Sequence, residues 1–459
     1  MDANVVLRPG RTPLADWRAV FRGAAVALDP FAQVDVEAGR AALASILAQN
    51  GLLPPLDKAS ASPSIAELIE ARGEILPDGE LRLFAALKLA ALAQGASGVR
   101  WEIVQALAAL LESDFLPVAP ESANDRLALS HLFAALTGAG EVLHRGRIYP
   151  AAEKLRDADL HPVSLNPRER SALLSGTELT LARTLAALFT AERVFQSTLV
   201  STALSSLAAN NPDTAMHLTA HRLHRQRGQL DVATALRALA PERTADASGA
   251  PVIEGTNADR SAIFRAGAAL DLLRQAAILL ERAANSVSED RLVLWQSEEM
   301  VSGVEDTTSL ALAADLMSMA LATLGALAAA RIAASADSDS GGAAARAASL
   351  ATKMRENAGA PALDPAGIKR LPPLVDAASK IVAIEFLEAA RREETDGDGL
   401  ADVLDMVRRA APKAAERAKP SDRDIRAVAE RVRSGALAAA ADVPLPSVVP
   451  LPPERARPR

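Results

Sequence analysis

Residues 305–335 read EDTTSLALAADLMSMALATLGALAAARIAAS, and this stretch decides the fold. Alanine and leucine dominate it and no proline interrupts it, so it predicts one very long helix. The apolar run within it, residues 316–330, ends at Arg331 and falls short of the roughly 20 residues that a membrane span needs. We therefore expect a buried core helix, with more apolar surface than one chain covers comfortably, and hence an oligomer.

The composition of the whole chain extends this expectation to an all-α fold. Apolar residues make up 49% of the 459 residues and aromatic residues only 3%, and alanine and leucine favour helix. A capped surface helix is predicted to begin at Thr12-Pro13, and two helices are predicted to meet at Gly95 to Gly98. Further helices are expected at about 36–50, 64–72, 167–209, 228–240, 257–286, 342–357, 371–393, 399–418 and 421–438.

The same pattern predicts how the chain is organised along its length. Residues 1–165 form an N-terminal helical region, with a small hairpin near 141–150 around Gly146. Residues 166–395 form a bundle of long central helices that also serves oligomerisation. Residues 396–442 form C-terminal helices, and the Pro-rich residues 443–459 are expected to be an extended and mobile tail.

Charge and cysteine content exclude several classes of protein. The net charge is −7 at pH 7 and the basic residues alternate with acids, which argues against binding to nucleic acid. There is no cysteine, which excludes disulfides, thiolate metal sites and a cysteine nucleophile. The start, MDANVVLRPGRTPLADW, lacks the apolar core of a signal peptide, so we expect a cytoplasmic protein without a membrane segment.

No motif predicts a metal or nucleotide site. His217 and His221 of HLTAHRLH, residues 217–224, are four residues apart, a spacing that lets two histidines on one helix bind a metal ion. Arginines surround them, however, which favours a structural or surface loop over a metal site. His131 and His144 are expected to be satisfied core or surface residues. The DGDG of residues 396–399 lacks the later acids of a calcium loop and predicts a solvated turn.

Several segments, in order, resemble the histidine and aromatic amino-acid ammonia-lyase family. The resemblance spans about residues 5 to 440 and implies a helical subunit that assembles as a homotetramer. It also implies elimination of ammonia through an electrophile, methylidene-imidazolone (MIO), formed from an internal Ala-Ser-Gly, with a tyrosine as base. The resembling segments are LKLAALAQGASGVRWEIVQALAALLESDFLPVAP (87–120), HPVSLNPRERSALLSGTELTLA (161–182), RLHRQRGQLDVATALRAL (222–239), ANSVSEDRLVLW (284–295), SKIVAIEFLEAARR (379–392) and SDRDIRAVAERVRSGAL (421–437).

The loop that should carry the electrophile departs from the family pattern. Pro117-Val-Ala-Pro120 keeps the family's corner, but Glu121-Ser-Ala-Asn124 follows where a glycine-rich segment with Ala-Ser-Gly is expected. Ser122-Ala123-Asn124 does not offer a small residue, a serine and a glycine in that order. We therefore interpret Ser122 as a helix cap and expect no MIO and no other cofactor.

The other positions implied by the resemblance are changed too. Leu68 stands at the family's histidine, and Ser175 replaces the asparagine of Asn-Gly-Thr. Glu254 and Asn257 stand in a segment of which only Arg260 matches the family. In the family that arginine anchors the substrate carboxylate, which suits a guanidinium; the alternative is a structural pair with Glu254 or Asp259.

The sequence and the resemblance allow three functions to be compared. The first is a divergent family member without MIO-dependent activity that acts as a binding or scaffold subunit, either as a homotetramer or assembled with an intact lyase. The second is an MIO-independent lyase that eliminates an amine from a carboxylate-bearing, amino-acid-like substrate, with Glu254 or Glu305 as base. The third, an ordinary ammonia-lyase, conflicts with the changed loop and with the tyrosine count, because the single Tyr149 lies in the predicted hairpin.

Overall fold

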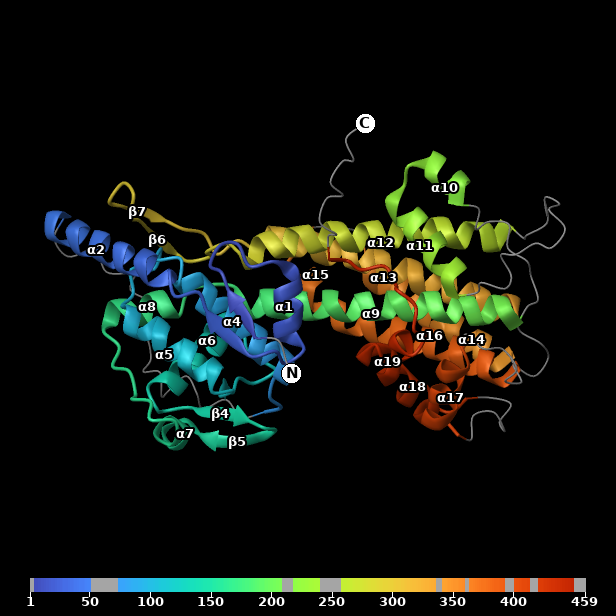
Figure 1. The fold of residues 1–459 in the computed structure, drawn as a ribbon, viewed down its shortest axis with the longest axis horizontal. Helices are drawn as coiled ribbons and strands as arrows, with labels where there is room; N and C mark the ends of the chain where they lie inside the picture. The colour runs from blue at the N-terminus through green and yellow to red at the C-terminus, as the bar shows by residue number, and fades with distance from the viewer. Residues whose placement is uncertain are drawn as a thin grey trace. The chain divides into compact units, whose positions relative to one another are not determined.

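The computed structural model describes residues 4–50, 73–208, 218–239, 257–335, 341–359, 363–392, 400–412 and 420–449. Helices dominate these residues, which confirms the predicted all-α fold with long central helices (Figure 1). The chain forms two compact units. The first comprises Met1–Ala186 and Leu279–Leu310, and the second comprises Ala187–Ile278 and Ala311–Arg459.

The first unit is built around one almost completely buried helix, α4 (Asp78–Leu92). From Leu81 onward each of its side chains is buried, including one lysine, Lys88. Helices α1 and α5 pack against it, and Gly95 and Gly98 form the predicted turn between α4 and α5 with positive φ angles. The other helices of this unit are α1 (Leu14–Phe21), α2 (Ala32–Asn50), α5 (Trp101–Glu112), α6 (Asp125–Leu136), α7 (Ala151–Asp157) and α8 (Pro167–Leu173).

Short strands join these helices. The hairpin predicted near 141–150 is present: β4 (Glu141–His144) pairs antiparallel with β5 (Arg147–Pro150), and β3 (Leu116–Pro117) adds to β4. Two pairs were not predicted. They are the parallel β1 (Val5–Leu7) and β2 (Val26–Leu28), and the hairpin of β6 (Arg291–Leu294) and β7 (Glu299–Ser302).

The second unit contains a helical bundle in which α16 packs against both α14 and α18. Ser421 caps α18 through a reciprocal pair with Asp424, and Gly435 ends that helix in the left-handed conformation that favours glycine. The helices are α9 (Glu178–Ala208), α10 (Leu218–His224), α11 (Arg227–Leu239), α12 (Asn257–Ala284), α13 (Thr308–Ala334), α14 (Gly341–Ala358), α15 (Ala366–Lys369), α16 (Leu371–Arg392), α17 (Ala401–Ala410), α18 (Asp422–Ser434) and α19 (Ala436–Ala439); α9, α12 and α13 begin or end in the first unit.

Helix α13 is the predicted core helix. Among the described residues it alone is long and apolar enough, by length and composition, to cross a membrane, so the sequence estimate that this run is too short was wrong. The helix starts at Thr308, well before the apolar run. In the structure 67% of its most apolar window is buried within the protein, and Met317, Leu321 and Leu324 are fully buried. This burial is typical of a core helix.

Two predictions about the ends of the chain need correction. Thr12 does not cap α1; its hydroxyl bonds to the backbone of Arg8, and Pro13 occupies the cap position without a side-chain bond. The tail is extended up to Val449 but is held in place. The hydroxyl of Ser447 donates to Glu192 at 2.6 Å, and Val448 is fully buried. Residues 450–459 lie outside the described residues.

Candidate functional site

The site lies where the predicted helix 167–209 is interrupted. Residues 174–177 separate α8 from α9, so that prediction of one continuous helix was wrong. Gly176 has a φ of 133°, and a Cβ atom there would overlap the Glu178 carboxylate. A residue with a side chain would be strained at this φ and would clash with Glu178, so the position requires glycine. The helix is interrupted here although the neighbouring residues favour helix. The break exposes the backbone of residues 175–177 to side chains from other segments.

The break brings together two of the residues predicted from the sequence, Ser175 and Glu305. The Ser175 hydroxyl donates to Oε1 of Glu305 at 3.0 Å, and the backbone N–H of Gly176 donates to the same oxygen at 2.8 Å. Ser175 is buried, whereas Glu305 is exposed. Glu305 is therefore a carboxylate fixed by two donors at the surface of the first unit.

Further acids surround this pair. The backbone N–H of Asp290 donates to the Ser175 hydroxyl at 2.8 Å. Burial and, as a smaller contribution, repulsion from Glu305 raise the pKa of the Asp290 carboxyl. Asp125 accepts hydrogen bonds from the backbone and the hydroxyl of Thr180. Burial raises the pKa of Asp125 in spite of these bonds. The site is consequently acidic, and the carboxyl groups of Asp290 and Asp125 hold protons more tightly than free ones.

Beneath Ser175 lies a buried ion cluster, which we define as Lys88, Glu178 and Glu289. The Lys88 ammonium donates to the Ser175 carbonyl at 2.7 Å and lies 3.4 Å from Glu178 and 3.5 Å from Glu289. The side chains are 0%, 4% and 1% exposed. The Ser97 hydroxyl adds a bond of 2.7 Å to Glu289. One lysine thus links the break to α4 and to the segment before β6.

The charges of the ion cluster do not balance unless one acid is neutral. Burial acts to lower the pKa of Lys88, but Glu178 and Glu289 outweigh it and raise that pKa. Burial also raises the pKa of Glu178 to about 7, against the attraction of Lys88. Lys88 therefore stays charged, and Glu178 is the acid that takes up a proton near neutral pH.

The loop after β3 does not place Ser122 as predicted. Asn124, not Ser122, caps α6, and its side chain accepts from the Leu127 N–H at 2.9 Å. Ser122 is exposed in a turn, whereas Ala123 is buried and its N–H donates to the Pro120 carbonyl at 3.0 Å. The helix-cap interpretation of Ser122 was wrong, because the acceptor sits two residues later.

Ala-Ser-Gly tripeptides do occur elsewhere: one, Ala247-Ser248-Gly249, lies outside the described residues, and the other is Ala96-Ser97-Gly98. It lies in the turn between α4 and α5, and Ser97 belongs to the surroundings of the ion cluster through its bond to Glu289. The family resemblance aligns the electrophile with residues 121–124, not with this turn.

Several predicted positions are not described. Leu68, Glu254 and the DGDG segment lie outside the described residues, and Asn257 and Arg260 lie on α12 with side chains outside the description. Tyr149 lies on β5 in the hairpin, as predicted, with the Lys154 ammonium 4.3 Å from its ring centre.

Four of the described histidines lie on helices or strands, namely His131, His144, His221 and His224. His221 and His224 lie on helix α10 and not in a loop, so that part of the prediction was wrong, but both contact the Gln229 side chain, which fits the structural role. His131 is largely buried on α6, where burial lowers its pKa, and His144 contacts the Asp114 carbonyl at 3.1 Å. Within the described ranges no group of three metal-binding side chains was found.

The sequence analysis did not predict the ion cluster. Lys88 is the one charged residue in the otherwise apolar FAALKLAAL, which is a signal that a buried cation needs carboxylate partners. Its partners could not be identified, because Glu178 and Glu289 lie 90 and 201 residues away along the chain.

A family model described as aromatic amino acid lyase matches residues 64–366. The chain therefore belongs to the aromatic amino acid lyase family. Similar solved structures include histidine ammonia-lyase from Trypanosoma cruzi, with a TM-score of 0.77, 22% identity and coverage of 96% of this chain and 95% of that one.

Two further structures show the same fold. The ergothioneine-degrading enzyme ergothionase from Treponema denticola has a TM-score of 0.81 at 18% identity and covers 95% of this chain and 99% of that one. The phenylalanine aminomutase of Pantoea agglomerans has a TM-score of 0.78 at 19% identity, with coverage of 94% and 98%. These likenesses confirm the helical lyase fold that the sequence predicted.

Proposed function

We propose that this chain is a member of the aromatic amino acid lyase family that forms no internal electrophile and acts as a binding or scaffold subunit. The observation that carries this proposal is the loop of residues 121–124. Cyclisation at Ser122 would need the following N–H, that of Ala123, to attack the carbonyl of the preceding residue, Glu121, and the serine to dehydrate. The family uses glycine and alanine at these two flanking positions, whereas here the preceding residue is a glutamate and the Ala123 N–H already donates to the Pro120 carbonyl at 3.0 Å. The residues present do not fit the MIO group.

The test combines an ammonia-release assay with the intact mass of the protein. We expect no ammonia from histidine, phenylalanine or tyrosine, with a working histidine ammonia-lyase as the positive control. Restoring a single residue should not restore activity, because groups that act together in a transition state fail together. Sustained ammonia release that disappears in Ser122→Ala would contradict the proposal.

A second candidate function is favoured by the geometry of Glu305. In this case the chain would eliminate an amine from a carboxylate-bearing, amino-acid-like substrate without an electrophile, and Glu305 would remove a proton as general base. The two donors from Ser175 and Gly176 fix one oxygen of Glu305 at 3.0 and 2.8 Å. A base held in one position is what proton transfer requires. Ergothioneine is the first substrate to try, since an ergothioneine-degrading enzyme shares the fold.

For either function, the family position of Arg260 implies that this residue would hold the carboxylate of a bound ligand. Arg260→Ala should weaken the binding of carboxylate ligands by more than about 1.5 kcal/mol, the lower range for hydrogen bonds to charged groups. Calorimetry with ergothioneine and a panel of amino acids measures this effect. Glu305→Gln is the matched variant, because it should abolish turnover while leaving the affinity close to that of the parent. Equal affinities for the parent and Arg260→Ala would make Arg260 structural.

We also propose that the chain assembles as a homotetramer in the cytoplasm, or as a mixed tetramer with an intact lyase subunit. Support comes from apolar side chains of α13 that stay exposed in the single chain, with Leu312 at 38% and Met319 at 46%. Apolar surface on a long helix favours symmetric association. Light scattering at micromolar concentration should give a tetramer mass, and a clean monomer would contradict this expectation.

A further inference from the structure

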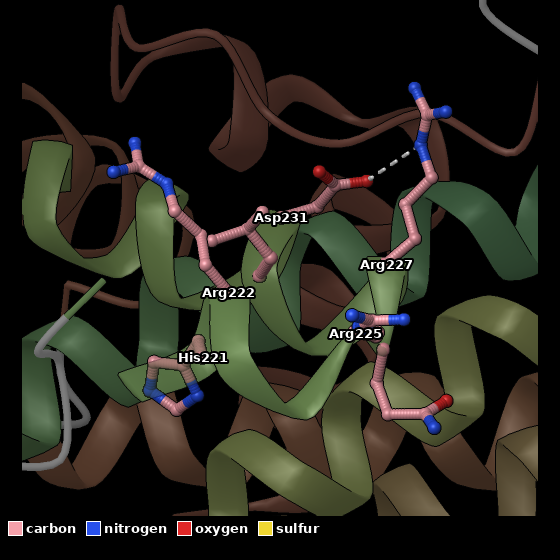
Figure 2. A pocket seen from close by; sticks show the side chains of 7 residues that line it. His221, Arg222, Arg225, Arg227 and Asp231 are labelled. Atoms are coloured by element: carbon pink, nitrogen blue, oxygen red, sulfur yellow. Dashed lines mark ion pairs between the residues drawn. The ribbon is translucent and has the colours of Figure 1, made fainter. Parts of the chain in front are cut away.

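A second polar site lies on the second unit, where α10 meets α11. The turn between these helices forms a surface hollow of about 330 Å³. Arginines 222, 225 and 227 line it together with His221, Gln226 and Asp231 (Figure 2). Three guanidinium groups within six residues stand out in a chain whose net charge is −7. Volumes of this size suit small ligands.

Two of these arginines have no acidic partner among the described residues. Among the residues that the structure describes, neither Arg222 nor Arg225 forms an ion pair, and both are exposed. Arg227 lies 4.0 Å from Asp231, and its side chain is 61% exposed. In Figure 2 the side chains of Arg222 and Arg227 flank Asp231. The hollow therefore presents a surplus of donors that carry positive charge.

The one acid among the described residues that line the hollow, Asp231, already has a partner. Arg274 on α12 donates to Asp231 at 2.6 Å, a shorter contact than the one that Arg227 makes. The negative charge of Asp231 is thus largely compensated by a residue that is not among the lining residues of the hollow. Repulsion of an incoming anion by Asp231 is reduced accordingly.

The backbone holds the arginines in this arrangement. Arg225 has a φ of 58°, in the left-handed region, which costs about 1 kcal/mol for a residue with a side chain. This conformation turns the chain directly from α10 into α11, with the Arg225 N–H donating to the Arg222 carbonyl at 3.3 Å. Helix α11 starts at Arg227, so its positive end lies at the same hollow.

We propose that this hollow binds a compact phosphoryl anion, such as pyrophosphate or the phosphate groups of a small metabolite. Guanidinium groups pair with phosphoryl oxygens through two parallel hydrogen bonds. Three of them offer more donors than the two oxygens of one carboxylate can accept, which favours a phosphoryl group over a simple acid. This site is independent of the acidic site around Ser175 and Glu305.

The test is calorimetry with inorganic pyrophosphate at low salt, on the full chain. The double variant Arg222→Gln/Arg225→Gln should bind about tenfold more weakly or worse, since each lost charge-assisted bond is large. The control Arg423→Gln/Arg426→Gln removes the same charge from exposed positions of α18 and should bind like the parent. Circular dichroism melts should show all three proteins equally folded.

The outcomes separate cleanly. Pyrophosphate binding that is lost in the hollow variant and kept in the control supports the site, as does weaker binding of malonate, a dicarboxylate, to the parent. No binding to the parent, equal binding to parent and hollow variant, or malonate binding as tight as pyrophosphate would overturn the proposal.

Discussion

Replacing Lys88 with methionine should lower the free energy of unfolding by about 3–5 kcal/mol, the usual cost of removing one partner from a buried ion pair. Lys88 is completely buried, and its ammonium lies between Glu178 and Glu289 and bonds to the Ser175 carbonyl. Methionine fills similar space but leaves two carboxyl groups and a carbonyl without a cation. Urea denaturation at neutral pH measures the effect.

The matched control for this variant is Lys353→Met on the exposed face of α14. Such a surface substitution should change stability by no more than about 0.5 kcal/mol. The loss in Lys88→Met should shrink when Glu178→Gln and Glu289→Gln are added, because the triple variant leaves no unpaired charge in the ion cluster. Equal stabilities of Lys88→Met and Lys353→Met would show that the ion cluster does not hold the first unit together.

Replacing Glu178 with glutamine should remove a pH dependence of stability between about pH 4.5 and 7. The folded-state pKa of Glu178 is about 7, whereas the ordinary value is 4.5. The folded protein therefore binds the proton more tightly than the unfolded chain, so this residue stabilises the fold at low pH. That contribution is lost as the pH rises through the folded pKa. The shift corresponds to roughly 3 kcal/mol for a group this deeply buried.

Denaturation curves at pH 5 and pH 8 measure the difference between the parent and Glu178→Gln. Relative to the parent, the variant should gain roughly 2.5 kcal/mol on going from pH 5 to pH 8, since glutamine mimics the protonated acid at both values and part of the full change lies below pH 5. The exposed Glu356→Gln on α14 serves as the control and should follow the parent. A variant whose stability follows the parent at both pH values would mean that Glu178 titrates normally.

The helices were predictable where one composition persists over many residues. Residues 305–335 and 371–393 contain strong helix formers over more than five turns, and α13 and α16 match them. The break at 174–177 was hidden, because one glycine in a favourable helical context does not by itself end a helix. Strands β1 and β2 have three residues each, too few for a periodic signal.

The candidate site was only partly predictable for a related reason. Ser175 and Glu305 were named from the resemblance and from chemistry, and their contact joins residues 130 positions apart. No local pattern could place them together. Asn124 is preferred at helix caps as strongly as Ser122, and the two lie so close that sequence preferences alone did not separate them. The contact between Lys88 and Glu289 depends on the burial of α4 in the folded chain, so neither local sequence predicts it.

The intact mass of the purified protein tests the central proposal most directly. Formation of the family's electrophile removes two water molecules from the chain, and no other activity or ligand is needed to detect the loss. We predict the full mass of the unmodified chain, equal to the masses of the Ser122→Ala, Ser97→Ala and Ser248→Ala variants once the mass change of each substitution is subtracted. A parent mass short by two waters would contradict the account, and the substitution that abolishes the deficit would locate the electrophile at residues 121–124, at Ala96-Ser97-Gly98 or at Ala247-Ser248-Gly249.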